Sequence, residues 1–184
     1  KKNKVFYLFV YLIILFNKPA ISDDSKIEII KNYLGELRFF SASFIQDDNK
    51  TTSEGKIYIG EKRVRVEYKN PIKILIILDK DKAMYYNYEL DEDEFFNPKD
   101  TPAWFFYDIF NNLDFFNEAK IKSSNNNLVL EKIDFNKTEK FKIEVFFEDN
   151  PLILRRIKLE VGGEYLSLSI LDHKYNETFD KSFF

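Results

Sequence analysis

The sequence predicts a mainly β protein with a smaller α component (α+β), built on one curved antiparallel sheet that curls into a barrel or a half-barrel. Apolar and charged residues alternate along segments such as 63–68, a period of two that is typical of strands with one buried face. Turn signals separate these segments, among them Gly60-Glu61, Asn70-Pro71 and Gly162-Gly163. Only two stretches after residue 22 have helical periodicity, so most of the fold is expected to be sheet.

The length and composition fit a single domain with a hydrophobic core. The chain has 184 residues, of which 45% are hydrophobic and 17% are aromatic. It contains no cysteine, which excludes disulfide bonds, thiol catalysis and thiolate metal sites.

The first 22 residues have the pattern of a cleaved signal peptide. A basic segment at 1–4 precedes twelve apolar residues at 5–16, and Ala20-Ile21-Ser22 is a small-x-small cleavage signal. The apolar run is shorter than the roughly 20 residues that span a bilayer. We predict export and a mature domain of residues 23–184, whose formal charge falls from −3 to −7 because four lysines are removed. This acidity argues against nucleic acid as a partner.

The mature chain is predicted to begin with a helix of about ten residues. Ser25 is the expected N-cap, Glu28 completes a capping box, and the helix ends near Leu34-Gly35. From 37 to 46 the hydrophobic period changes to two, which indicates a strand. Its apolar face carries Phe40, Ala42 and Phe44.

Residues 55–90 are predicted to form four consecutive strands in a meander. Residues 72–78 are almost continuously apolar, which indicates a strand covered on both faces. The sheet continues at 85–88 and 94–96, on either side of an acidic run.

A second helix is expected at residues 103–113. Thr101 is a suitable N-cap, and Pro102 suits the first helical position. Large apolar side chains occupy more than half of the helix circumference, so this helix cannot lie on a surface alone. They are Trp104, Phe105, Phe106, Ile109, Phe110 and Leu113.

The second half of the chain returns to strands. Turn-rich segments separate them, and Gly162-Gly163 is a two-residue hairpin signal. The predicted strands are 119–122, 128–135, 141–147, 152–161, 164–171 and a last one that ends at Phe184.

Residue types that support catalysis are scarce. The single histidine, His173, lies between two predicted strands and is expected to be structural. The acidic run 91–94 lacks the glycine and the alternating spacing of a calcium loop. The sequence has no glycine-rich phosphate loop, serine elbow or histidine cluster. We therefore predict a protein that is not an enzyme, with no catalytic residue, no metal and no cofactor.

The surplus of aromatic side chains allows two arrangements. In the first, the helices pack permanently into a collapsed core, and composition alone favours this arrangement. In the second, the helices form a movable lid over a dry pocket for acyl chains. An acyl chain gains roughly 0.8 kcal/mol for each buried CH₂ group, so it needs an apolar tunnel and not polar contacts.

From about residue 30 to residue 184, the order and spacing of several short motifs resemble a known family. The family is that of the periplasmic outer-membrane lipoprotein carrier proteins, the LolA family. The motifs are, in chain order, Phe44-x-Gln46, Gly55, residues 65–68, Pro71, Asp79, Met84 with Tyr86, Thr101-Pro102, and Asn176-x-x-Phe179-Asp180.

This resemblance implies an incomplete β-barrel, a half-barrel whose concave face is covered by short helices. It implies a periplasmic chaperone that binds the acyl chains of lipoproteins in a hydrophobic cavity. The protein would take them from an inner-membrane lipoprotein-releasing ABC transporter to an outer-membrane acceptor, and we expect it to be a monomer. The cavity and lid positions are Phe40, Phe44, Val64, Val66, Met84, Tyr86, Trp104, Phe105, Ile109 and Phe110.

Two other functions on the same fold stay open, a sensing or regulatory domain that recognises a partner protein and a carrier of glycolipids. The chain also departs from the family pattern. Gly60-Glu61 stands where the family has Arg-Pro, whose arginine holds the lid closed. Arg63 and Arg65 are close in sequence, but the period of two puts both on the face opposite Val64. The family also commonly continues beyond the position of Phe184.

Overall fold

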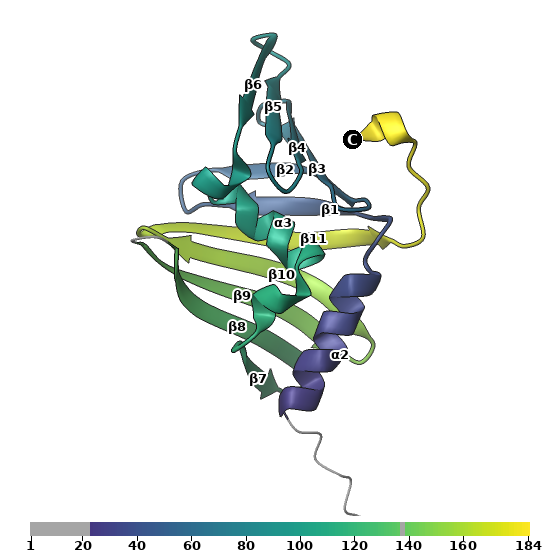
Figure 1. Ribbon diagram of the computed structural model, residues 1–184, viewed down its shortest axis with the longest axis vertical. Helices are drawn as coiled ribbons and strands as arrows, with labels where there is room; N and C mark the ends of the chain where they lie inside the picture. The colour runs from purple at the N-terminus through teal and green to yellow at the C-terminus, as the bar shows by residue number, and fades with distance from the viewer. Residues whose placement is uncertain (1–22, 137–138) are drawn as a thin grey trace, which may run out of the picture.

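The computed structural model describes residues 23–136 and 139–184, which form one open antiparallel sheet with helices on one face (Figure 1). The sheet has 11 strands in the order β6-β5-β4-β3-β2-β1-β11-β10-β9-β8-β7. Every pair of neighbouring strands is antiparallel. The predicted α+β fold with an incomplete barrel is confirmed, while the predicted signal peptide at 1–22 lies outside the described residues.

Two meanders make up this sheet, and the pairing of β1 with β11 joins them. The first meander contains β1 (Phe40–Asp47), β2 (Thr52–Ile59), β3 (Val64–Asn70), β4 (Ile74–Leu78), β5 (Ala83–Asn87) and β6 (Glu92–Phe96). The second contains β7 (Lys120–Ser124), β8 (Asn127–Asn136), β9 (Glu139–Asp149), β10 (Leu152–Val161) and β11 (Glu164–Lys174).

Helical segments precede, connect and follow the two meanders. They are α2 (Asp23–Glu36), η1 (Pro98–Asp100), α3 (Ala103–Asn111), η2 (Leu113–Phe116) and η3 (Lys181–Phe183). In Figure 1, α2 and α3 cross the concave face of the sheet, while the β4, β5 and β6 hairpins extend beyond α3. No helix among the described residues combines the length and the hydropathy needed to cross a membrane.

Local sequence signals explain most of the strands. The alternation in β1 buries Phe40, Ala42 and Phe44 on one face and leaves Ile45 exposed, as predicted. Gly162-Gly163 connects β10 to β11, and both glycines have positive φ angles of 58° and 83°. A two-residue hairpin turn of this type needs such angles, which glycine adopts without steric cost.

Helix α2 begins earlier and α3 ends earlier than the sequence indicates. Ser25 is inside α2 and not at its N-cap, because Asp23 and Asp24 already occupy the first turn, where the helix dipole favours acidic side chains. Helix α3 ends at Asn111, whose side-chain amide donates a hydrogen bond to the Tyr107 carbonyl. The chain then leaves helical geometry at Asn112.

The prediction of a last strand ending at Phe184 is wrong. Residues 175–180 contain no strand, and the Glu177 amide donates to the Phe39 carbonyl at 2.8 Å. Aromatic packing holds this segment instead, with Phe183 lying 5.0 Å from the Tyr58 ring and 4.5 Å from the Arg65 guanidinium carbon. Tyr58 and Arg65 are paired on the convex face, so the C-terminal segment covers the outside of β2 and β3.

The helices pack tightly on the part of the concave face formed by β8, β9 and β10. Helix α3 contributes Phe105, which lies 4.6 Å from Phe141 of β9 between ring centroids, and η2 contributes Phe116. Helix α2 adds Ile30 and Leu34, and all of these side chains are buried. In this part of the sheet, the helices therefore pack into a collapsed core, which is the first of the two arrangements that the sequence allows.

Candidate functional site

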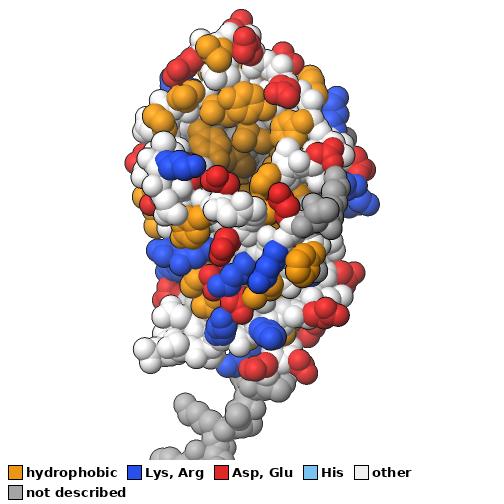
Figure 2. Space-filling model, turned by 90° about the vertical axis from the view of Figure 1, so that its left-hand side faces the viewer, with side chains coloured by type: hydrophobic (Ala, Val, Ile, Leu, Met, Phe, Trp, Pro, Cys, Tyr) orange, Lys and Arg blue, Asp and Glu red, His pale blue; other side chains and the backbone are white. Residues whose placement is uncertain are grey.

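A second part of the concave face, formed by β1 to β4 and the start of β11, is not filled. Between this surface and the N-terminal turn of α3 is a cavity of about 180 Å³. Figure 2 shows a hollow lined by hydrophobic side chains in the upper half of the molecule, with acidic side chains near its rim. The cavity is lined by Gln46, Ile57, Val66, Tyr68, Ile76, Leu78, Pro102, Ala103, Phe106, Leu166 and Leu168.

Strand register aligns the apolar wall of this cavity. Ile57 of β2 is paired with Val66 of β3, and Val66 is paired with Ile76 of β4. Side chains at paired positions lie on the same face of a sheet, so these three residues form a continuous row. None of them carries a polar group, which makes the wall suitable for hydrocarbon and unsuitable for a charged ligand.

An aromatic pair lies beside the cavity, and one of its rings, Tyr68, is part of the lining. Phe44 and Tyr68 meet edge to face, with ring centroids 5.1 Å apart, on either side of Gly55. A Cβ atom on Gly55 would lie 2.6 Å from the Phe44 ring and 2.2 Å from the Glu67 carbonyl oxygen, so the close approach requires glycine. The strands therefore bring these rings together only because residue 55 has no side chain.

A hydrogen bond joins the two polar side chains that line this cavity. The Tyr68 hydroxyl donates a hydrogen bond of 2.7 Å to the Gln46 side-chain oxygen. Burial raises the pKa of Tyr68 to about 12, so the hydroxyl keeps its proton at any physiological pH. The pair therefore introduces no charge into the cavity.

Helix α3 covers the cavity with one stripe of its apolar surface, while most of its large apolar side chains pack in the core. Ala103 and Phe106, which are three residues apart, face the hollow. Phe105, Ile109 and Phe110 are buried in the hydrophobic core. One large helical side chain, Phe106, therefore reaches the cavity.

The sequence matches the family described as "Outer membrane lipoprotein carrier protein LolA" over residues 36–184. This match covers most of the chain. The chain belongs to the LolA family. It is a family of periplasmic carrier proteins, so the fold and the apolar cavity agree with the family assignment. A comparison with curated proteins finds no match.

Solved structures support the fold at low sequence identity. An uncharacterized conserved protein from Thermus thermophilus has a TM-score of 0.56 and 9% identity, over 87% of this chain and 91% of that one. MucB has a TM-score of 0.53 and 8% identity, over 86% of this chain and 60% of MucB. This LolA-family chain thus spans less than two thirds of MucB.

Of the positions matched to LolA proteins in the sequence, Val66 lines the cavity. Phe44 supports the cavity from behind Gly55, through its contact with Tyr68. Trp104 is half-buried on the other side of α3, against Phe105, with ring centroids 4.1 Å apart. The remaining core positions are buried without lining the cavity, and they are Phe40, Val64, Phe105, Ile109 and Phe110.

The predicted inward orientation of Met84 and Tyr86 in this LolA-family chain is wrong. Met84 is paired with Ile77 of β4. The side chain of Ile77 is on the face of the sheet opposite to that of its neighbour Ile76, which lines the cavity. Tyr86 donates a hydrogen bond to Asp91 near the hairpin tip. Strand β5 carries large side chains on both faces, so the period of two does not identify its inner face. The inner face carries Ala83, Tyr85 and Asn87.

Several cavity residues were not among the sequence predictions. Tyr68 could have been found by continuing the period of two from Val66, and Ile76 and Leu78 by treating 72–78 as an alternating strand. Leu166 and Leu168 come from the second meander, and no local signal relates β11 to β1. The lining residues absent from the predicted cavity and lid positions are Gln46, Ile57, Tyr68, Ile76, Leu78, Pro102, Ala103, Phe106, Leu166 and Leu168.

The described residues contain no group of side chains arranged to hold a metal ion. His173 is 2.7 Å from the Leu154 carbonyl through its Nε2 atom, and burial lowers its pKa. Neutral imidazole in a hydrogen bond to a strand carbonyl is a packing arrangement. The chemistry that the site offers is therefore apolar binding.

Proposed function

We propose that this protein carries lipoproteins across the periplasm by binding their acyl chains in the cavity beside α3. It would be exported by the segment 1–22, receive its cargo from an inner-membrane lipoprotein-releasing ABC transporter and deliver it to an outer-membrane acceptor as a monomer. The observation that carries the proposal is an apolar, uncharged cavity in a chain that belongs to the LolA family.

The chemistry of the cavity favours an acyl chain over a polar ligand. Its walls are mostly aliphatic and aromatic, and the Tyr68 hydroxyl is already hydrogen-bonded to the Gln46 side-chain oxygen. A polar ligand would lose its hydration there and meet mostly hydrocarbon in its place. An acyl chain instead gains roughly 0.8 kcal/mol for each CH₂ group that leaves water.

The cavity volume limits what binds without movement. Sites for small organic molecules typically measure about 300 to 1,000 Å³, and this cavity measures about 180 Å³. It accommodates part of one acyl chain in the conformation described. A triacylated cargo therefore requires displacement of α3 from the sheet, which would add the space now occupied by Phe106.

Two neighbouring isoleucines provide a matched test of this proposal. Ile76 faces the cavity, whereas Ile77 lies on the opposite face of β4, and both are half-buried. The variant Ile76→Trp should fill the cavity and weaken binding of a synthetic triacylated lipopeptide at least tenfold. The control Ile77→Trp should bind it within about twofold of the unmodified chain. Equal binding by both variants would exclude the cavity as the acyl site.

The natural cargo is identified by native mass spectrometry of the protein purified from the periplasm after export. A bound triacylated lipoprotein is the expected species. If the bound species is instead a glycolipid, the protein is a glycolipid carrier and not a lipoprotein carrier. A stable complex with a partner protein and no lipid would instead support a regulatory domain.

A further inference from the structure

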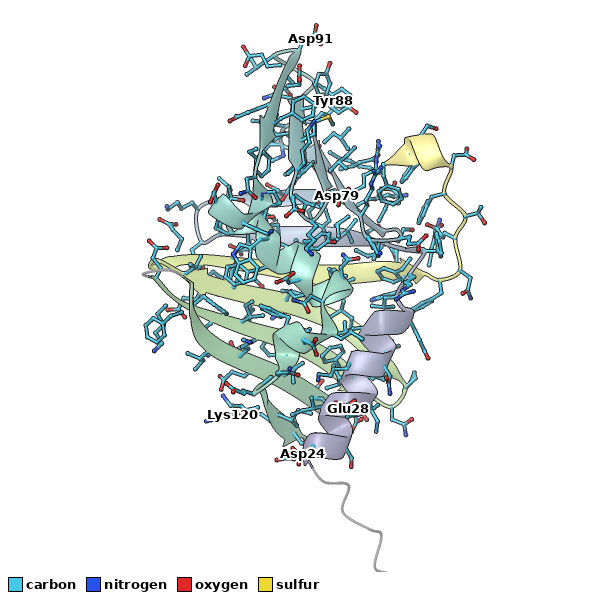
Figure 3. The ribbon with its side chains drawn as sticks, in the orientation of Figure 1. Asp24, Glu28, Asp79, Tyr88, Asp91 and Lys120 are labelled. Carbon is cyan, nitrogen blue, oxygen red and sulfur yellow. The ribbon has the colours of Figure 1, made fainter. Side chains whose placement is uncertain are left out.

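A second cavity lies on the other side of α3, away from the acyl cavity. It measures about 490 Å³ and is enclosed by α3, η1 and the turns that connect β2 to β3 and β4 to β5. Figure 3 labels Asp79 at the start of the β4–β5 turn, which lies near α3. The lining residues are Lys62, Lys80, Pro98, Lys99, Trp104, Tyr107, Asp108, Asn111 and Asn112.

The floor of this cavity is one face of α3. Trp104, Tyr107, Asp108 and Asn111 recur at intervals of three, one and three residues, which places them on a single stripe of the helix. Ala103 and Phe106 occupy the stripe that faces the acyl cavity. The two cavities therefore use different faces of the same helix and have no lining residue in common.

Three lysines from separate turns converge on this cavity. Lys62 comes from the β2–β3 turn, Lys80 from the β4–β5 turn and Lys99 from η1. Lys99 forms an ion pair of 2.5 Å with Asp81. The ammonium groups of Lys62 and Lys80 form no ion pair or hydrogen bond with any residue that the structure describes.

The carboxylates nearby neutralise only part of this positive charge. Asp79 is paired with Arg63 at 3.3 Å, and Asp81 is paired with Lys99. Asp108 is the one acidic residue among the lining residues. Burial raises the pKa of Asp108, because a partly buried carboxylate is less well solvated than one in water.

We propose that this cavity binds a phosphate ester. Lys62 and Lys80, whose ammonium groups have no ion-pair partner among the described residues, supply the positive charge that a phosphate group requires, since lysine binds phosphate as a mobile point charge. Trp104 and Tyr107 supply an aromatic floor for the organic part of the ligand. A volume of about 490 Å³ is in the range typical of small-molecule sites. The inference does not depend on acyl binding, because the two cavities are separate.

Trp104 provides a direct readout, because it is the only tryptophan in the sequence and lines this cavity. We would titrate the full chain with glycerol 3-phosphate and, in a second arm, with phosphatidylcholine vesicles with and without phosphatidylglycerol. Sodium chloride at equal ionic strength controls for screening. A saturable change in Trp104 emission is expected, and the responding arm distinguishes a free phosphate ester from a lipid headgroup.

Matched lysine variants assign the response to the cavity. Lys62→Ala/Lys80→Ala should raise the half-saturation concentration at least tenfold, whereas Lys69→Ala/Lys73→Ala, at exposed positions outside the cavity, should leave it unchanged. Both double variants should bind the triacylated lipopeptide normally. A response that sodium chloride reproduces, that persists in Lys62→Ala/Lys80→Ala, or that is absent with both phosphate sources would overturn the proposal.

Discussion

The two parts of the concave face differ in how much of each is filled by helical side chains. Over β8 to β10, α2, α3 and η2 place buried rings such as Phe105 and Phe116 against the sheet. Over β2 to β4, one helical ring, Phe106, reaches a cavity of about 180 Å³. Strand residues in both parts are apolar, so residue type in the sheet does not account for the difference.

This comparison shows that the collapsed core and the lined cavity coexist in one molecule. Large apolar side chains of α3 such as Phe105 pack in the filled part of the concave face. Only Ala103 and Phe106 of this helix face the hollow part. The hollow results from where the helix lies and how it is rotated. Stability and ligand binding should therefore be separable by mutation, with stability depending on the filled part and binding on the hollow part.

The largest effect is expected for Phe105→Ala in the filled part. Phe105 is 1% exposed and contacts the rings of Trp104 and Phe141. Truncating such a residue typically costs about 3 to 5 kcal/mol, which includes the cavity left behind. Urea denaturation measures this loss in the free energy of unfolding. The half-buried control Phe106→Ala should lose clearly less, and equal losses would show that both parts are packed alike.

The next effect concerns the boundary of the cavity at Gly55. In Gly55→Ala the new methyl group meets the Glu67 carbonyl and the Phe44 ring, and the expected cost is about 1 to 3 kcal/mol. In Gly60→Ala the methyl group meets the Phe184 ring, whose flexible side chain can move aside. Thermal unfolding of both variants should give the larger loss for Gly55→Ala. The reverse order would mean that the C-terminal segment is packed more rigidly than the aromatic pair beside the cavity.

Tyr68 provides a pH-dependent effect that is absent at neutral pH and develops only above pH 10. Its pKa is raised from about 10 to about 12 by burial in the folded state, so its stabilisation is fully present below pH 10. Above pH 10 the unfolded chain loses this proton first, and stability falls by about 1.4 kcal/mol per pH unit until pH 12. Denaturation of Tyr68→Phe across this range should show a shallower fall. Burial also raises the pKa values of Tyr33 and Tyr58. These two residues contribute equally to the pH dependence of stability in the unmodified chain and in Tyr68→Phe, so they do not affect the difference.

The smallest effect is expected for the ion pair between Lys99 and Asp81, which links η1 to the β4–β5 turn beside the second cavity. The two side chains are 53% and 72% exposed, and exposed pairs contribute about 0.2 to 1 kcal/mol. Lys99→Ala should therefore shift the free energy of unfolding by less than about 1 kcal/mol, and less at high salt. A loss above about 2 kcal/mol would mean that charge, not packing, holds this segment.

Sequence patterns predicted the sheet better than the cavity. Strand β10 has the predicted bounds, 152–161, because charged and apolar residues alternate between clear turn signals. In β5 both faces carry large side chains, so Met84 and Tyr86 were assigned to the wrong face. Period two identifies a strand, but only the pairing with β4 identifies which face is inside.

The position of the cavity depends on long-range contacts that no local pattern contains. Leu166 and Leu168 reach it because β11 pairs with β1 across more than a hundred residues of chain. The sequence predicted that α3 must be buried, but its rotation over the sheet follows from packing with α2 and η2. The motif Asn176-x-x-Phe179-Asp180 resembles the last strands of the family and predicts a strand, but this segment packs as an aromatic layer on the convex face.

That aromatic layer also has a mechanical consequence. Phe179, Phe183 and Phe184 cover the convex side of β2 and β3, and the concave side of the same two strands forms the cavity wall. This wall has close-packed groups on its outer side, so it resists bending outward when a guest presses on it. The opposite side of the cavity is a nine-residue helix. If ligand binding enlarges the cavity, we therefore expect α3 to be displaced while the sheet wall keeps its position.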